Sequence, residues 1–392
     1  MKALFLHNRY QQAGGEDGVV RAEIALLREQ GHQVELLEES NDGIVGGSEA
    51  LKAAFRCVYS PAAGRQVRER ISRARPDVVH IHNFFPRLSP AIHYACSQAH
   101  VPVVQTLHNY RLLCPKALLL RDDRVCEACV GRKVPWPAVL HACYRDSYAA
   151  TAAVAAMDAV HNALGTWQRK VNIFVALTEF AKRKFSQGGL PAEKIVVKPN
   201  FVYPDPGVGS ESRSYALFVG RLSEEKGIRT LLSAWKRLLP SRPLKLVGEG
   251  PLEPLAAEAS EQIPGVEWLG ACNRDQVLEL MGAASFLIVP SHWFEGFPLA
   301  VVEAFAKGTP VVASCLGALA ELVEHRCTGL HFQPGEPADL AEQVDWAFTH
   351  PTELQRFRLN ARQEYDAKYT GEKNYELLAN IYSKAIRNDK QL

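Results

Sequence analysis

Two short apolar runs and the segment between them, residues 284–314, constrain the fold of this 392-residue chain more than any other stretch. The first run, 284–289, reads Ala-Ser-Phe-Leu-Ile-Val, and the second, 310–313, reads Pro-Val-Val-Ala. Apolar runs of this length are typical of buried strands, and the segment between them has the length of a helix. We therefore expect a strand, a loop, a helix and a second strand, as in a parallel α/β sheet.

The loop after the first run carries residues suited to binding an anion and hydroxyl groups. Gly296 allows the backbone to approach a ligand, and Pro298 fits the first turn of a helix. The helix start directs free N–H groups and a positive dipole end outward, which suits a phosphate. Glu295 and Glu303 can accept hydrogen bonds from hydroxyl groups. Phosphate plus polyol indicates a sugar nucleotide, although glutamates at this spacing are also typical of solvated surface charges.

Similar apolar runs followed by helix-sized segments recur along the chain and predict a doubly wound α/β fold. The chain is too long for one ordinary core and fits two domains of about 200 residues each. We expect one domain over 1–205, a linker near 203–214 and a second domain over 206–370. The first helix is expected from about 18 to 30. The other apolar runs lie at 3–7, 33–37, 77–82, 101–107, 173–177, 195–197, 215–219, 244–247 and 266–269.

Composition and charge indicate a globular protein that is soluble in water. Apolar residues make up 47% and charged residues 22%, and no apolar run reaches membrane-spanning length. The first residues lack the pattern of a signal peptide, so none is expected. We therefore expect a cytoplasmic protein. Residues 1–205 carry 26 Lys and Arg against 19 Asp and Glu, whereas the remainder carries 19 against 24. The basic first half is either a surface for peripheral contact with an anionic membrane or an ordinary solvated face.

A further turn suited to phosphate is expected where the run at 215–219 ends. Arg221 and Lys226 follow Gly220 in a turn that leads into a helix near residue 228. The planar fork of an arginine and the compact charge of a lysine can bracket a diphosphate. An isolated pair of this kind would be surface charges, but its position after a strand favours a ligand-binding role.

Polar residues also follow strand ends in the first domain, where doubly wound folds bind ligands. His82 ends the run at 77–82 and His108 follows the run at 101–107, although a single histidine there is also typical of a structural residue. Gly15 lies after the first strand in a Gly-Gly pair, which by itself indicates only a turn. The basic residues of this half are not interleaved with aromatic residues, so nucleic-acid binding is not expected.

Four cysteines in the segment 111–145 have the spacing C-x11-C-x2-C-x13-C; they are Cys114, Cys126, Cys129 and Cys143. Four thiolates that include one close pair can complete a tetrahedral zinc site. We expect a structural zinc ion that pins this segment. The alternatives are four reduced thiols and an iron–sulfur cluster, whereas a disulfide framework is disfavoured in a cytoplasmic protein.

The pattern Glu295-Gly296-Phe297-Pro298 with Glu303 resembles the paired-glutamate motif of the retaining glycosyltransferases of family 4, and the turn at 220–227 resembles the same family. The resemblance extends over essentially the whole chain. It implies the GT-B architecture, in which two Rossmann-like domains face each other across a cleft. Residues 1–205 would bind the acceptor, 206–370 would bind the nucleotide sugar, and a helix over 371–392 would cross back to the first domain.

The resemblance also implies a role for each candidate site residue. Arg221 and Lys226 would stabilise the departing diphosphate. Glu295 would hold the transferred sugar, His108 would lie beside it, and Glu303 would hold the ribose hydroxyls. The remaining donor-binding positions would be Gly15, Gly220, Gly296, Phe297 and Leu299.

The expected activity is retaining transfer of a hexose-type sugar from a UDP or GDP sugar to a saccharide or lipid-linked saccharide, in cell-envelope polysaccharide or glycolipid synthesis. No convincing Asp-x-Asp motif is present, because Asp122-Asp123 lies in the cysteine-containing segment, so no catalytic metal is expected. The alternatives are a nucleotide-sugar epimerase of the same architecture and a non-catalytic scaffold that binds nucleotide sugars.

Overall fold

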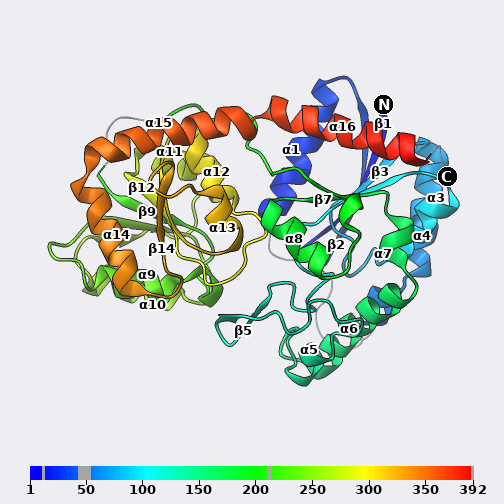
Figure 1. Cartoon of the computed structure of the whole chain (residues 1–392), viewed down its shortest axis with the longest axis horizontal. Coiled ribbons are helices and arrows are strands. Elements are labelled where there is room, and N and C mark those ends of the chain that lie inside the picture. Colours follow the sequence, from blue (N-terminus) through cyan, green and yellow to red (C-terminus); the bar gives the residue numbers. More distant parts are fainter. Residues whose placement is uncertain (11–13, 43–53, 210–213, 390–392) are drawn as a thin grey trace. The chain divides into compact units, whose positions relative to one another are not determined.

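The computed structural model describes residues 1–10, 14–42, 54–209 and 214–389 (Figure 1). The chain divides into two compact units. The first unit comprises Met1–Leu119, Cys126–Pro199 and Asn374–Leu392, and the second comprises Leu120–Val125 and Asn200–Lys373. Each unit contains a six-stranded parallel sheet, which confirms the expected doubly wound α/β fold class.

The sheet of the first unit has the strand order β2-β1-β3-β4-β7-β8, and all neighbouring strands are parallel. The chain moves outward from β1 in one direction to β2 and in the other direction to β3, so the order reverses beside β1. The strands are β1 (Lys2–Arg9), β2 (Gln33–Ser40), β3 (Val78–Ile81), β4 (Val103–Thr106), β7 (Ile173–Ala176) and β8 (Ile195–Val197).

The sheet of the second unit has the order β11-β10-β9-β12-β13-β14 and is also parallel throughout. Its order reverses between β9 and β12. The strands are β9 (Ala216–Val219), β10 (Leu244–Val247), β11 (Val266–Trp268), β12 (Phe286–Val289), β13 (Val311–Ser314) and β14 (Gly329–Phe332).

Helices connect these strands in both units. In the first unit they are α1 (Gly15–Glu29), α3 (Pro61–Ala74), α4 (Ala91–Gln98), α5 (Trp136–Leu140), α6 (Tyr148–Ala163), α7 (Thr166–Lys170), α8 (Glu179–Gln187) and the 3-10 turn η1 (Ala192–Lys194). In the second they are η2 (Glu224–Lys226), α9 (Ile228–Trp235), α10 (Glu253–Gln262), α11 (Arg274–Ala283), α12 (Leu299–Ala306), α13 (Gly317–Leu322), α14 (Pro337–Thr349) and α15 (Pro351–Lys368). The last helix is α16 (Gly371–Asp389).

Two details differ from the sequence-based expectation. Helix α1 begins earlier than expected, at Gly15, because the carboxylate of Asp17 accepts a hydrogen bond from the N–H of Gly14 (3.1 Å) and caps the helix. The segment 111–145 contains α5 and a hairpin of β5 (Leu120–Arg121) and β6 (Arg124–Val125). Asp122 and Asp123 both have positive φ, 51° and 54°, as a tight two-residue hairpin turn requires.

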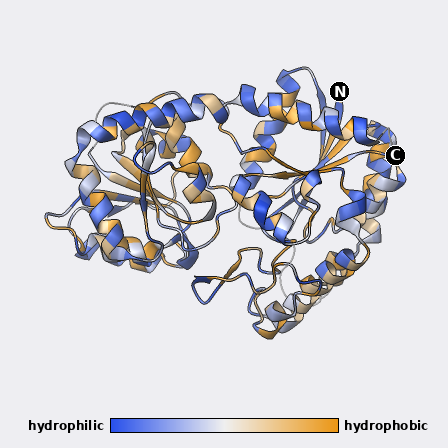
Figure 2. Ribbon diagram, viewed as in Figure 1, coloured by the Kyte–Doolittle hydropathy of each residue, from blue (hydrophilic) through white to orange (hydrophobic). Residues whose placement is uncertain are grey.

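The strands of both sheets are largely hydrophobic in Figure 2. Their apolar side chains are buried on both faces, as expected for parallel sheets covered by helices. On one face of the first sheet, Phe5 and Val78 pack with residues of α1 and of α16. The α16 residues in this core are Leu378, Ile381, Tyr382 and Ala385. Across the described residues, no helix combines the length and the hydropathy needed to cross a bilayer.

The packing of α16 predicts a specific loss of stability. Leu378→Ala should lower the free energy of unfolding of the first unit by about 2–5 kcal/mol, because Leu378 is fully buried and its truncation leaves a cavity. The matched control is Leu377→Ala, since Leu377 is 37% exposed and should cost less than about 0.5 kcal/mol. Urea unfolding followed by circular dichroism measures both variants, and equal losses would contradict the packing of α16.

Candidate functional site

The ends of β9 and β12 form the first part of the candidate site. These strands are adjacent, and the strand order reverses between them. Open α/β sheets bind ligands outside the carboxyl ends of their strands at such a reversal. The chain continues from β9 into the turn 220–227 and from β12 into the loop 290–298. Most of the expected donor-binding residues lie in these two segments.

Lys226 and Glu295 meet at this position. The ammonium Nζ of Lys226 lies 2.7 Å from Oε1 of Glu295, and the hydroxyl of Ser291 donates to the same oxygen at 2.7 Å. Glu295 is only 4% exposed, whereas the side chain of Lys226 is 27% exposed. A lysine ammonium has three hydrogens, so Lys226 can bind Glu295 and still donate to an anion. Sequence reasoning missed Ser291, although its place directly after a strand and Pro290 was a usable signal.

Close packing of the two turns depends on Gly227. Its φ is +75°, and a Cβ atom there would lie 1.8 Å from the carbonyl oxygen of Pro290. The N–H of His292 donates to the carbonyl of Glu225 at 3.0 Å, and Nε2 of His292 lies 2.8 Å from the hydroxyl of Thr230. Glycine is therefore required on both conformational and steric grounds.

The other expected charged residues of the second unit are Arg221 and Glu303. Arg221 is exposed, and its guanidinium forms no ion pair with any described residue. Glu303 lies on α12, where burial raises the pKa of its carboxyl group; the opposing influence of Arg274, with Nε 3.9 Å away, is smaller. Pro298 is the N-cap of α12 and not part of its first turn, so that expectation was wrong.

The backbone positions predicted to bind the donor are placed as follows. Gly296 and Phe297 are partly buried in the loop before α12, and Leu299 is the first residue of that helix. Gly220 directly follows β9, and its N–H donates to the carbonyl of Val247 at 3.0 Å. The N–H of Gly220 is thus already used within the fold.

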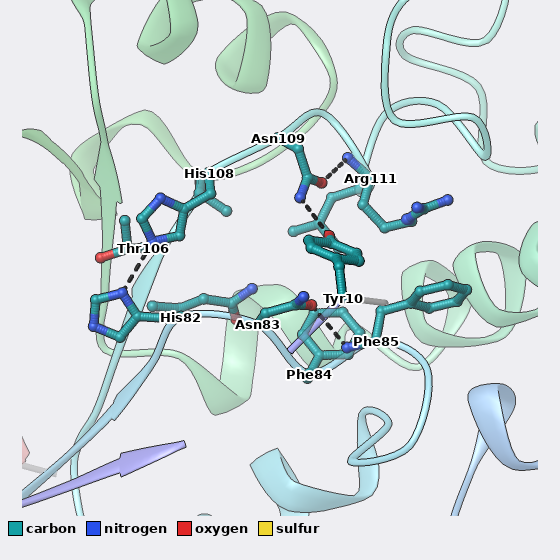
Figure 3. Close-up of a pocket in the computed structure, with 12 residues that line it drawn as sticks. Tyr10, His82, Asn83, Phe84, Phe85, Thr106, His108, Asn109 and Arg111 are labelled. Atoms are coloured by element: carbon teal, nitrogen blue, oxygen red, sulfur yellow. Dashed lines mark hydrogen bonds between the residues drawn. The ribbon is translucent and has the colours of Figure 1, made fainter. Parts of the chain in front are cut away.

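A pocket in the first unit lies at the ends of β3 and β4 (Figure 3). Asn109 donates to the hydroxyl of Tyr10 at 3.0 Å, and its side-chain oxygen accepts the N–H of Arg111 at 3.1 Å. These bonds hold the polar wall of the pocket in one arrangement. The lining residues are Tyr10, His82, Asn83, Phe84, Phe85, Gln105, Thr106, Leu107, His108, Asn109, Arg111 and Leu112.

His108 is connected to a buried charge cluster behind this pocket. Its Nε2 lies 2.9 Å from Nδ1 of His82, and Nε2 of His82 lies 3.4 Å from Oε2 of Glu23. Nζ of Lys198 lies 2.6 Å from the other oxygen of Glu23. Burial alone would raise the pKa of Glu23, but Lys198 and His82 hold that pKa well below its usual range. Burial lowers the pKa of both His82 and His108, so both rings are neutral near pH 7.

Glu23, His80 and His82 also have the spacing of metal ligands, with ligand atoms within 4.8 Å of one another. The two nitrogens of His80, however, contact the hydroxyls of Tyr382 (2.7 Å) and Thr106 (2.8 Å). A buried ammonium already neutralises Glu23 and would repel a cation. We therefore interpret the cluster as an ion pair with attached histidines.

Sequence reasoning missed Glu23, His80 and Lys198. The available signal was a charged residue at position 23 on the apolar face of α1, among the buried Val20, Ile24 and Leu27.

The remaining predicted residues also lie in the first unit. Gly15 is the exposed first residue of α1. Cys114 is buried, and Cys126, Cys129 and Cys143 are partly buried. Burial, with smaller contributions from the other three thiols, raises the pKa of the Cys129 thiol to about 11. The other three thiols thus lie near Cys129, but no three of these four sulfur atoms lie within 4.8 Å of one another.

Comparisons with known proteins match the two halves of the chain to two different family models. Residues 13–205 match the family model described as Glycosyltransferase Family 4, and residues 206–364 match the model described as Glycosyl transferases group 1. An uncharacterised glycosyltransferase of Methanocaldococcus jannaschii is 31% identical over 175 residues, 43% of this chain and 45% of the relative. The phosphatidyl-myo-inositol mannosyltransferase of Mycolicibacterium smegmatis is 25% identical over 328 residues, 78% of this chain and 73% of the relative. The match to the first relative thus spans less than half of its length.

Solved structures share the fold over nearly the full length. The Anabaena protein HepE, crystallised with UDP and glucose, has a TM-score of 0.69 at 19% identity and covers 98% of this chain and 99% of its own. Sucrose-phosphate synthase from Thermosynechococcus elongatus has a TM-score of 0.74 at 16% identity and covers 99% and 100%. At these identities the likeness concerns the fold, and that fold is GT-B.

The steric role of Gly227 is testable with a matched pair of glycines. Gly227→Ala should lower the free energy of unfolding of the second unit by about 3 kcal/mol or more, because backbone strain adds to a clash with Pro290. Gly31 has a similar φ of +77° but open space around it, so Gly31→Ala should cost only about 1–2 kcal/mol in the first unit. Chemical denaturation measures both, and a cost at Gly227 no greater than at Gly31 would contradict this role.

Proposed function

The chain belongs to glycosyltransferase family 4, and from this premise we propose that it transfers a hexose-type sugar from a nucleoside diphosphate sugar to an acceptor hydroxyl, with retention at the anomeric carbon. The observation that carries the proposal is the Lys226–Glu295 pair, supported by Ser291, at the reversal of the second sheet. A cation that retains free donors, beside a carboxylate and a helix start, suits a diphosphate attached to a polyol.

In the proposed mechanism the barrier is departure of the diphosphate from an oxocarbenium-like carbon. Lys226, Arg221 and the start of α12 lower this barrier by stabilising negative charge on the leaving group. The acceptor attacks from the face that the phosphate leaves, and a leaving phosphate oxygen takes the hydroxyl proton. These groups supply the charge stabilisation without a divalent ion.

The remaining residues are proposed to orient the donor. Glu295 would bind hydroxyls of the transferred sugar, and Glu303 would bind the ribose hydroxyls. In the first unit, His108 would contact the sugar and Gly15 the diphosphate. Backbone positions 220, 296, 297 and 299 would complete the donor contacts.

The names of the relatives suggest which class of nucleotide sugar is the donor and which class of molecule is the acceptor. HepE was crystallised with UDP and with UDP-glucose, which supports a UDP sugar over a GDP sugar. The name phosphatidyl-myo-inositol mannosyltransferase, together with the basic first half of this chain, supports a lipid-linked saccharide acceptor at an anionic membrane surface in cell-envelope synthesis. A soluble saccharide would use the same donor site.

The deciding experiment is a thermal-shift panel of UDP, GDP and their sugars, each with Mg²⁺ and with EDTA. We expect one nucleotide series to raise the melting temperature regardless of metal, because a ligand that binds only the folded state stabilises it. Stabilisation by none would favour the non-catalytic scaffold, and strict Mg²⁺ dependence would overturn the metal-free mechanism. Product analysis with the stabilising donor then separates transfer from epimerisation, which needs no acceptor.

Lys226→Ala should reduce kcat/KM by the equivalent of about 2–4 kcal/mol, as the loss of one transition-state donor does elsewhere. Lys236→Ala is the matched control, since Lys236 is an exposed lysine at the end of α9 in the same unit. Activity of the Lys226 variant within about threefold of wild type would remove this residue from the mechanism.

The four cysteines are proposed to hold a structural zinc ion, which is supported by the position of the other three thiols near Cys129. Protein purified without chelator should contain about one equivalent of zinc, and Cys129→Ser should lose it. Cys315→Ser, at an exposed cysteine of the second unit, should keep it. Metal content below about 0.1 equivalent in the wild type, measured by mass spectrometry, would refute the site.

A further inference from the structure

A chain of buried polar contacts leads from Lys198 to the pocket in Figure 3. Lys198 contacts Oε1 of Glu23 at 2.6 Å, Oε2 of Glu23 lies 3.4 Å from Nε2 of His82, and Nδ1 of His82 lies 2.9 Å from Nε2 of His108. Lys198, Glu23 and His82 are at most 4% exposed. His82 and His108 both line the pocket, and His108, the last member, is partly exposed.

The chemistry of Lys198 and Glu23 determines which atom donates the proton at each contact in this series. A lysine ammonium only donates, and an ionised carboxylate only accepts. Oε2 of Glu23 and Nε2 of His82 lie 3.4 Å apart, and neither atom has a hydrogen-bond partner among the described residues. Nδ1 of His80 is farther from Oε2, at 3.8 Å, and contacts Tyr382 instead. Buried polar atoms are rarely left unsatisfied, and a proton on Nε2 of His82, directed at Oε2 of Glu23, satisfies both atoms.

The proton position on His82 then determines the proton position on His108. In a neutral imidazole one nitrogen donates and the other accepts. With its proton on Nε2, His82 must accept at Nδ1, and His108 must donate from its own Nε2. The reverse order would place the bare Nε2 of His82 against the carboxylate of Glu23, two acceptors facing each other in a buried position.

We infer that Glu23, acting through His82, is a positioning residue that fixes His108 in its Nε2-protonated tautomer, so that Nδ1 of His108 accepts a hydrogen bond from a hydroxyl of the bound sugar. The sugar in this statement rests on the proposed function, whereas the tautomer does not. Nδ1 of His108 has no hydrogen bond to any described residue. A site with a fixed acceptor selects a sugar with a free hydroxyl there and rejects deoxy and O-methyl analogues, which offer no proton.

A Glu23→Gln variant tests the inference, because the contact with Lys198 determines the orientation of the new amide. The ammonium of Lys198 requires an acceptor, so the amide oxygen takes the place of Oε1. The amide NH₂ then faces Nε2 of His82 and requires an acceptor there. Both histidines should invert, and His108 should carry its proton on Nδ1.

Nitrogen-15 NMR of the histidine rings in ¹⁵N-histidine-labelled protein without ligand reads these tautomers directly. His108→Gln and His82→Gln variants assign the two signals. We expect His108 protonated on Nε2 in the wild type and on Nδ1 in Glu23→Gln. Glu35→Gln is the matched control, because Glu35 is an exposed glutamate of the same unit that contacts Arg70 at 3.4 Å, and it should leave both tautomers unchanged.

Two results would overturn the inference: a wild-type His108 protonated on Nδ1, or a folded Glu23→Gln protein in which His108 keeps its proton on Nε2. If Glu23→Gln does not fold, the wild-type spectrum alone decides. In activity assays, Glu23→Gln should narrow the preference for the natural donor over its deoxy analogues, whereas Glu35→Gln should not. The expected tautomers without any sugar transfer would overturn the proposed function and leave the tautomer assignment standing.

Discussion

Parallel strand pairing is the constraint on which the rest of this structure depends. Neighbouring parallel strands end at the same edge of the sheet. Where the strand order reverses, the connections that follow two adjacent strands diverge to opposite faces of the sheet. At the β9–β12 reversal this brings Lys226 and Glu295, far apart in sequence, within 2.7 Å. Gly227 makes the approach sterically possible, since a side chain there would meet Pro290.

The same principle operates in the first unit with a different chemical outcome. The ends of β3 and β4 bring His82 and His108 together, and α1 supplies Glu23 from the side of the sheet. Burying a lysine and a glutamate is costly unless each has a partner, and the pair is completed at 2.6 Å. The result is a carboxylate of fixed charge that orients a row of neutral rings.

Much of the fold could be predicted from local patterns. The apolar runs that predicted strands in both units correspond to strands, because short apolar runs suit strands that are buried on both faces of a parallel sheet. Helix ends were harder to predict from the sequence. The early start of α1 depends on the carboxylate of Asp17, and Pro298 is the N-cap of α12 and not its first helical residue. The β5–β6 hairpin escaped prediction because it is only two residues long on each side.

The sequence by itself determined the fold class, the family and the segments that carry the candidate donor site, since strand periodicity, glycines and charged residues at strand ends are local properties. Only the tertiary structure decided which of these residues touch. Ser291 became a partner of Glu295, and Glu23, His80 and Lys198 became one buried cluster. The physical reason is that hydrogen bonds and ion pairs act over a few ångströms between residues that the sheet order, and not the chain order, makes neighbours.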